Sequence, residues 1–190
     1  MTKFLQGFLV ALILLSVGVY IYLKQGYVNF NADQRPSQFE MHTAMAAVDA
    51  STDRNAGKLK NPVAANEENI TAGAKLYINH CAGCHGIPSH PDSQFGRSFY
   101  PSVPAFFKDA PDMSESQNFY IIQHGIRWSG MPSWKNTLDD NETWQLVTFM
   151  SNIEKLPPAA QKELEPFGEP PATNPAEKPS GGAKPMSDMK

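Results

Sequence analysis

The first apolar stretch of the chain is an uninterrupted run from Phe4 to Leu23, which contains no charged residue and is bounded by Lys3 and Lys24. A helix of these 20 residues is about 30 Å long, which matches the hydrocarbon core of a bilayer. We therefore expect residues 1–24 to form an uncleaved transmembrane anchor.

A cleaved signal peptide is the alternative for this segment. It fits less well, because the apolar run exceeds the usual length and large residues fill positions 19–30, where no small-x-small cleavage site follows. Tyr20, Tyr22 and Tyr27 gather at one end, as aromatic residues do at a membrane interface. The basic residues around the run only slightly favour a cytoplasmic N-terminus.

A polar connector, residues 25–65, follows the apolar run. Ser37 stands after a proline, Glu40 follows three residues later, and apolar residues continue at loosely helical spacing, so the connector contains one possible helix. A fully flexible connector would place the next domain about 35 Å from the membrane, whereas a helix packed on the domain or on the membrane would shorten that reach.

Residues 66–156 carry the periodicity of a compact helical domain. We expect one helix from the cap Asn66 to about His80, and a second from near Ser114 to His124, with glycine after it. A third begins at Asp139 and ends before the prolines that follow residue 156. No segment alternates convincingly as a strand, so the predicted class is all-α.

The remaining segment, residues 157–190, holds eight of the 16 prolines in the chain. This composition cannot build a core and predicts a disordered Pro-rich tail.

Charge and cysteine content narrow the classes of function. The chain has a net charge of −3, distributed as +2, −4 and −1 over residues 1–65, 66–156 and 157–190. An acidic central domain disfavours nucleic-acid binding. The two cysteines, Cys81 and Cys84, are too close in sequence to staple a fold, which excludes a disulfide scaffold.

The motif that carries chemistry is Cys81-Ala82-Gly83-Cys84-His85, at the end of the first predicted helix of the domain. Two thiols at this spacing can each add to one vinyl group of a haem, and the histidine that follows can then bind the iron. We therefore expect one covalently bound haem c, attached through Cys81 and Cys84, with His85 as an axial iron ligand.

Other interpretations of the motif are weaker. A structural zinc site requires further cysteine or histidine ligands at short spacing, and the chain has no other cysteine. A thioredoxin-like redox pair expects a βαβ context, which is missing. A chance occurrence is the remaining alternative.

A second axial ligand is sought among the eight methionines. Most lie in the anchor, the connector, the tail or a core helix, which leaves Met113 and Met131. Met131 stands in Gly-Met-Pro, where Gly130 permits close backbone approach to a flat cofactor and Pro132 stiffens the loop. Met113 precedes a helix without such a setting, and any single methionine can also be core filler.

These features together resemble the class I cytochrome c family, in particular its small, bacterial, membrane-anchored members with one haem. The resemblance covers residues 66–156 and implies a bundle of about 3–5 short helices around the haem. It implies His85 and Met131 as the axial ligands of the iron. Gly73 and Tyr77 look like the family's glycine–aromatic pair of the first helix, and Phe149 looks like their partner on the last helix.

The resemblance also suggests residues around the haem. Pro104 is similar to the proline whose carbonyl accepts the Nδ1–H of the haem histidine, although the loop before it is longer than in the shortest family members. Trp134 and Arg127 flank the methionine loop and could meet the haem edge or a propionate; equally, they could be a core residue and a solvated charge. We do not expect the four other histidines to bind the iron: His42, His80, His90 and His124.

We therefore expect a non-enzymatic carrier of single electrons with no small-molecule substrate. Haem is attached to c-type cytochromes outside the cytoplasm, so the domain would face the periplasm from the inner membrane. Its partners would be electron donor and acceptor proteins of respiratory or photosynthetic membrane complexes. The alternatives are a fixed cytochrome subunit of a larger oxidoreductase or oxidase, and a haem gas sensor or peroxidatic enzyme with an absent or labile methionine ligand.

Overall fold

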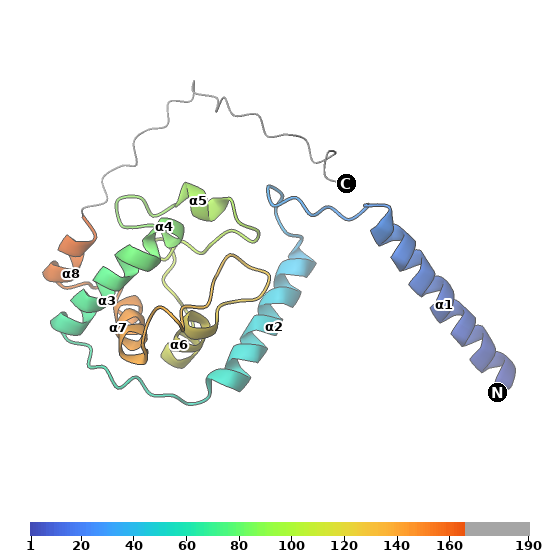
Figure 1. Ribbon diagram of the computed structural model, residues 1–190, viewed down its shortest axis with the longest axis horizontal. Coiled ribbons are helices and arrows are strands. Elements are labelled where there is room, and N and C mark those ends of the chain that lie inside the picture. The colour runs from blue at the N-terminus through green and yellow to red at the C-terminus, as the bar shows by residue number, and fades with distance from the viewer. Residues whose placement is uncertain (166–190) are drawn as a thin grey trace, which may run out of the picture.

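The computed structural model describes residues 1–165 of the 190-residue chain, and this part is all-α (Figure 1). It contains no strand, only an isolated bridge between Ile87 and His90. The all-α prediction is therefore confirmed. The eight helices of the described part are α1 (Thr2–Lys24), α2 (Gln38–Ala56), α3 (Glu67–His80), α4 (Ala82–His85), α5 (Gln94–Arg97), α6 (Glu115–His124), α7 (Asp140–Ser151) and α8 (Pro158–Glu163).

Four of these helices begin where the capping residues predicted. The side chains of Ser37, Asn66, Ser114 and Asp139 each accept a hydrogen bond from a backbone N–H in the first turn of α2, α3, α6 and α7. Asp139 and Glu142 form the predicted capping box, and Ser114 forms another with Gln117. These caps satisfy donors that no helical carbonyl can reach, which fixes the start of each helix.

The centre of the domain is the crossing of α3 and α7, which pack face to face (Figure 1). A Cβ on Gly73 would stand 2.7 Å from the Cβ of Phe149 and closer still to the carbonyl oxygen of Gln145. The missing side chain therefore lets the two backbones touch. Tyr77 fills the space beside this crossing, with its ring centroid 5.1 Å from that of Phe149. The predicted pairing of Gly73 and Tyr77 with Phe149 is confirmed.

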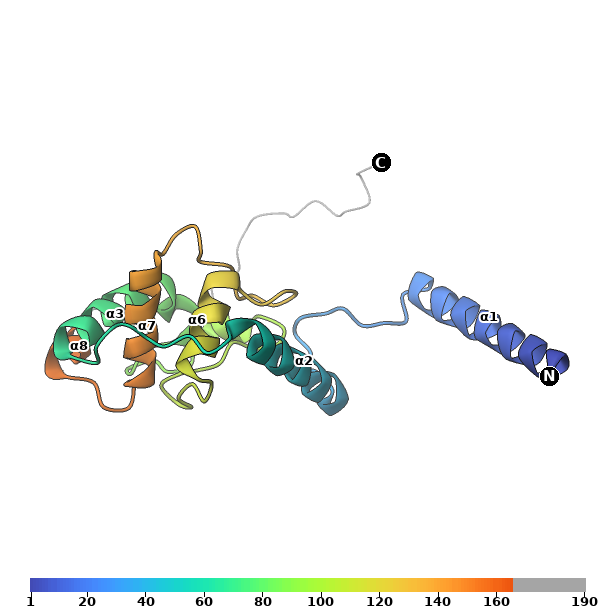
Figure 2. The same cartoon turned by 90° about the horizontal axis from the view of Figure 1, so that it is seen from below.

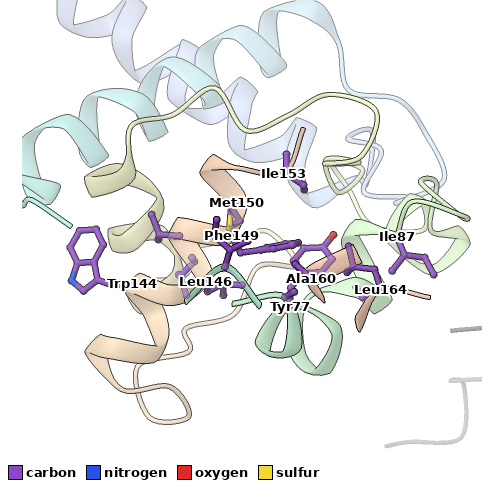
Figure 3. Packing of buried hydrophobic residues seen from close by; sticks show 14 of the residues in the cluster. Tyr77, Ile87, Trp144, Leu146, Phe149, Met150, Ile153, Ala160 and Leu164 are labelled. Atoms are coloured by element: carbon purple, nitrogen blue, oxygen red, sulfur yellow. The ribbon is translucent and has the colours of Figure 1, made fainter. Parts of the chain in front are cut away.

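A buried apolar cluster surrounds this crossing (Figure 3). Tyr77 and Phe149 are both fully buried at its middle. The Tyr77 hydroxyl donates to the carbonyl oxygen of Gly86 over 2.8 Å, so the polar end of the ring is satisfied. This bond ties α3 to the residue directly after the Cys81–His85 motif.

The connector is more ordered than a flexible tether. Its helix α2 lies beside α6 in both views (Figures 1 and 2). Asp53 of α2 accepts a 2.8 Å hydrogen bond from the side chain of Gln117. Asn61, which lies after the end of α2, donates to the hydroxyl of Thr148 of α7 over 2.9 Å. The fully flexible alternative, with its reach of about 35 Å, is therefore wrong for residues 38–65. Long-range polar contacts that the local pattern does not encode hold this segment on the domain.

The domain also extends further than the proline pattern predicted. Residues expected to begin the tail form α8, which packs against α3 and buries Ala160, and the C-cap residue Leu164 is buried as well. The tail boundary at residue 157 is therefore wrong. Pro158 starts this helix because its missing N–H would have had no helical partner in the first turn anyway. The rest of the predicted tail, residues 166–190, lies outside the described part of the chain.

The predicted anchor forms one continuous helix, α1, which stands apart from the other helices in Figures 1 and 2. It is long and apolar enough to cross a membrane, and none of its residues is buried against the rest of the chain. The domain itself holds α3 to α8, of which α4 and α5 are single turns of four residues. This is slightly more than the bundle of about 3–5 helices that the resemblance implied.

Candidate haem site

The Cys81-x-x-Cys84-His85 motif is one tight helical turn at the end of α3. Cys81 is the C-cap of α3, and its N–H donates to the carbonyl oxygen of Tyr77 over 2.8 Å. The carbonyl oxygen of Cys81 then accepts from the N–H of Cys84 at 3.0 Å and of His85 at 2.9 Å. The two thiols and the imidazole therefore project from a single turn with a fixed backbone.

Gly86 ends this turn in a left-handed conformation, with φ +82°. A Cβ there would meet the carbonyl oxygen of His90 at 2.8 Å. Only glycine fits, so the chain can reverse directly after His85. The reversal is the start of the long loop that returns to cover the motif.

That loop brings Pro104 to His85. The Nδ1 atom of His85 lies 2.9 Å from the carbonyl oxygen of Pro104. A carbonyl can only accept, so Nδ1 carries the proton and Nε2 keeps the lone pair that can bind a metal. The predicted hydrogen bond between these two residues is present.

The surroundings of His85 favour its neutral form. Burial lowers the pKa of the imidazole, and the hydrogen bond to Pro104 opposes this shift without cancelling it. The ring of Phe106 stacks on the imidazole with centroids 4.1 Å apart and an angle of 10° between the planes. Neutral imidazole is the form that ligates iron, so the site is prepared for that role.

The same surroundings disfavour ionised cysteines. Burial, and beyond it the neighbouring Cys84, raises the pKa of the Cys81 thiol to about 12, and burial also raises the pKa of Cys84. Zinc binding and thiol–disulfide exchange both require thiolates. Within residues 1–165, no group of three or more histidine, cysteine or acidic side chains is arranged to hold a metal ion. The raised thiol pKa counts against the thioredoxin-like interpretation, and the described residues offer no further clustered ligands for the zinc interpretation.

Met131 lies in the loop between α6 and α7 and is half-buried. Its N–H donates to Ser129 Oγ at 3.1 Å, and its carbonyl oxygen accepts from the N–H of Ile126 at 3.1 Å. Its side chain packs against the same apolar cluster that Cys81, Phe106 and Trp134 contact. Met131 and the motif residue Cys81 therefore border the same apolar cluster.

Glycines shape both ends of this loop. Gly125 adopts a φ of +69°, and a Cβ there would meet the carbonyl oxygen of Met131 at 2.8 Å. A Cβ on Gly130 would meet the Phe99 ring, at 2.7 Å from Cε1. The backbone at Gly130 therefore approaches the Phe99 ring closely, and its approach to a flat cofactor stays a prediction.

The two residues that flank Met131 in sequence are placed differently. Trp134 is half-buried, and its ring lies 5.0 Å from that of His80, next to Cys81. Arg127 is exposed. The structure therefore places Trp134 beside the residue that precedes Cys81 and leaves Arg127 exposed, and the role of each residue toward a haem stays a prediction.

The four other histidines have neighbours of their own. The His80 ring lies tilted against Trp134, the centroid of the His124 ring lies 4.4 Å from that of Tyr120, and Nδ1 of His90 is 3.1 Å from Ser89 Oγ. His42 is exposed on α2. None of these contacts resembles the arrangement around His85.

Two contacts of the site were missed in the sequence. Phe106, two residues after Pro104, stacks on His85, and the Ser93 hydroxyl donates to the carbonyl oxygen of Gly83 over 2.6 Å. The position of Phe106 beside the candidate proline is the signal that could have found it. Nothing in the spacing of Ser93 indicates its partner.

The donor set fits a c-type haem. Two uncharged sulfurs and an imidazole with a free Nε2 lone pair come from one turn, and a thioether in a stiffened loop packs on the same cluster. In the c-type cytochromes the thiols become thioethers, which stay uncharged when buried.

One family model matches the part of the chain that contains this site. Residues 68–150 match the family model described as cytochrome c oxidase, cbb3-type, subunit III. A chain of the reducing HAO-like protein complex of Kuenenia stuttgartiensis is similar over 51% of this chain, at 21% identity and a TM-score of 0.42. The match spans half of that protein's own length. No curated protein matches the chain.

The matched residues run from the start of α3 to the end of α7 and so include the motif, the Pro104 loop and the Met131 loop. The chain therefore carries a domain of the c-type cytochrome family, whose haem c is bound covalently and transfers electrons.

Proposed function

We propose that this protein is a membrane-anchored cytochrome that carries single electrons between membrane complexes on the extracytoplasmic side of the membrane. Cys81 and Cys84 would form the thioethers, and His85 and Met131 would be the axial ligands. The observation that carries the proposal is the His85–Pro104 hydrogen bond in a turn that also presents both cysteines. When bound, the haem takes up and gives up one electron at its iron without a change of bonds.

The residues around the motif supply what such a carrier requires. Pro104 and Phe106 fix the plane and tautomer of His85, so the ligand does not rearrange when the charge at the metal changes. A methionine thioether opposite an imidazole favours the reduced state and raises the reduction potential. With both axial positions filled by side chains, oxygen or a substrate would find no open position.

The proposed anchor and connector set how far the domain can search. Residues 25–37 form no helix, whereas α2 is held against the domain. A flexible link of this length has an r.m.s. span of about 20 Å. The domain would therefore remain close to the membrane, which suits exchange with complexes embedded there.

A fixed subunit of a larger complex is the second candidate function. The description of the matching family is that of an oxidase subunit. The close packing of α2 on α6 also shortens the freely moving part of the connector. A domain that exchanges electrons at one fixed place needs less reach than a shuttle.

Two measurements on native membranes test these alternatives. A reduced-minus-oxidised spectrum that shows a c-type haem, unaffected by carbon monoxide at neutral pH, supports six-coordinate electron transfer. A prompt spectral shift with carbon monoxide contradicts it and favours a sensor or peroxidatic role. Mild detergent extraction followed by size analysis separates the other two: a small particle supports the carrier, and a stable large complex supports the subunit.

A further inference from the structure

Trp128 holds its indole in solvent on the loop that carries Met131. The side chain is 93% exposed, and its φ of +60° is the only positive value at a non-glycine residue in the described part of the chain. A bulky residue in this region costs on the order of 1 kcal/mol of strain. The strain opposes folding and the exposed indole gains almost no burial to offset it, so the position of Trp128 requires an explanation.

The loop around Trp128 is firmly held. The N–H and the hydroxyl of Ser129 donate to the carbonyl oxygen of Ile126 at 3.2 and 2.8 Å, and the N–H of Met131 donates back to that hydroxyl. These bonds close the loop on both sides of the indole. The exposure of Trp128 is therefore part of the loop's built geometry.

Aromatic residues continue from this loop toward the cysteine motif. Gly130 rests on the Phe99 ring, and Phe99 meets Phe95 edge to face with centroids 4.9 Å apart. Phe95 belongs to α5 and is itself 61% exposed. We refer to Phe95, Phe99 and Trp128 as the aromatic patch.

The other side of α5 contacts the motif directly. A Cβ on Gly96 would collide with the carbonyl oxygen of Cys84, and Ser93 donates to Gly83. The aromatic patch thus borders both chain segments that the proposed function assigns to the haem, the Cys81–His85 turn and the Met131 loop.

The two chain segments that carry the patch are basic although the domain is acidic, and the nearest acidic side chains are Asp92, which lies close to Arg97, and Glu40, which lies close to Tyr100. Residues 93–107 and 125–138 contain Arg97, Arg127 and Lys135 and no acidic residue, whereas residues 66–156 carry a net charge of −4. Arg97 lies two positions after Phe95, and Arg127 directly precedes Trp128. Both arginines are exposed. A surface that joins exposed aromatic rings to arginines has the composition of protein–protein hot spots.

We propose that the aromatic patch, with Arg97 and Arg127 at its rim, is the surface on which this domain docks its redox partner. The proposal rests on the proposed electron-transfer function. The partner's docking surface would have an apolar centre that covers Trp128 and a rim of carboxylates that face the arginines. Small transient interfaces of this kind use charge for encounter and a few aromatic contacts for affinity. A lipid surface is less suitable, because it would cover the side of the domain through which electrons must pass.

The first test measures electron exchange in native membranes that contain the full chain, parent or variant, as the only copy. Trp128→Asn removes the indole and keeps a residue that tolerates positive φ. We expect at least a 5-fold lower rate of exchange with the membrane partner. The reduction potential and the rate with ferricyanide should stay unchanged, and Trp128→Phe should restore most of the partner rate. Phe39→Ala is the matched control, because Phe39 is 82% exposed on α2.

Arg97→Glu tests the rim in the same assay. It should slow the exchange and reduce its dependence on salt, whereas Arg54→Glu on α2 should leave both unchanged. The proposed docking surface is overturned if Trp128→Asn and Arg97→Glu exchange electrons with the membrane partner as fast as the parent and the two control variants do. In that outcome the proposed function still stands, because the haem exchanges electrons in every variant. If the parent haem never changes redox state in the membranes, the proposed function fails and the docking surface fails with it.

The lipid alternative is tested with the same position. In the Trp128→Cys variant with haem attached, the new cysteine is the only free thiol and can carry a nitroxide label. The protein is placed in vesicles of phosphatidylethanolamine and phosphatidylglycerol, and the collision rates of the nitroxide with a polar relaxation agent and with oxygen are measured. We expect the rates of a label that is exposed to water. A label at acyl-chain depth overturns the proposal in favour of membrane docking.

Discussion

The Nδ1–H of His85 donates to the carbonyl oxygen of Pro104, with 2.9 Å between the nitrogen and the oxygen, although Pro104 lies nineteen residues further along the chain. This bond joins the cysteine-containing turn to the far end of the loop that covers it. It fixes which ring nitrogen is free, and it places Phe106 on the face of the same imidazole. One backbone oxygen therefore determines both the tautomer and the orientation of the proposed iron ligand.

Met131→Ala tests the second axial ligand. We expect the haem to stay covalently attached, because Cys81 and Cys84 are untouched, while the reduction potential falls by on the order of 0.1 V and carbon monoxide binds. Redox titration and a carbon monoxide difference spectrum measure both effects. Met113→Ala is the control, since Met113 is half-buried but lies outside the apolar cluster as described. If only the Met113 variant shows these changes, the ligand assignment is reversed.

Gly73→Ala tests the crossing of α3 and α7. The new methyl group would overlap the Gln145 carbonyl and the Phe149 side chain, so the helices must separate. We expect a loss of about 1–3 kcal/mol in the free energy of unfolding of the haem-loaded protein, measured by guanidinium titration. Gly83→Ala should cost far less, because no atom lies within 4 Å of a Cβ at Gly83. Equal losses for the two variants would contradict the packing described.

Tyr77 should make stability depend on alkaline pH. Burial raises the pKa of this phenol above its ordinary value of 10.0, and in the haem-free chain the nearby Cys81 and Cys84 thiolates add to the shift. The unfolded chain then loses the phenol proton at lower pH than the folded one. The contribution of Tyr77 to stability is therefore complete below pH 10 and declines as the pH rises above it.

Tyr77→Phe is the variant that isolates this effect. It should abolish the part of the alkaline decline that Tyr77 causes and cost about 1–2 kcal/mol at neutral pH, because the Gly86 carbonyl loses its hydrogen bond. Unfolding titrations from pH 7 to 11 measure both quantities. An alkaline slope identical in parent and variant would show that Tyr77 is not the group responsible.

Leu164→Ala tests whether α8 belongs to the domain. Leu164 is 2% exposed, so truncation should cost about 2–4 kcal/mol of unfolding free energy. Lys162→Ala, at an exposed position of the same helix, should cost almost nothing. A Leu164 variant as stable as the Lys162 variant would return this segment to the tail.

The features that the sequence predicted best are those set by neighbouring residues. The caps at Asn66 and Ser114 depend on a side chain and a backbone N–H three residues apart, so they are readable in a linear pattern. The pairing of Gly73 and Tyr77 with Phe149 was implied by the resemblance to the class I cytochromes c, and the structure shows it. These elements lie where they were expected.

The features that were missed depend on distant parts of the chain. Two prolines at 157 and 158 indicate the end of a helix, but they do not show that Ala160 and Leu164 meet α3 and are buried there. The sequence gives no sign that Asp53 of the connector forms a hydrogen bond with Gln117, because the two residues are 64 positions apart. The exposure of Trp128 is equally unreadable, since an apolar residue in a loop would ordinarily be assigned to the core.

The intact mass of the purified full chain is the most direct test of the central claim. Covalent attachment of one haem predicts a mass about 616 Da above that of the polypeptide, with the increment on the peptide that contains Cys81 and Cys84 and with no titratable thiol. A mass equal to that of the polypeptide, with two reactive thiols, would contradict the account.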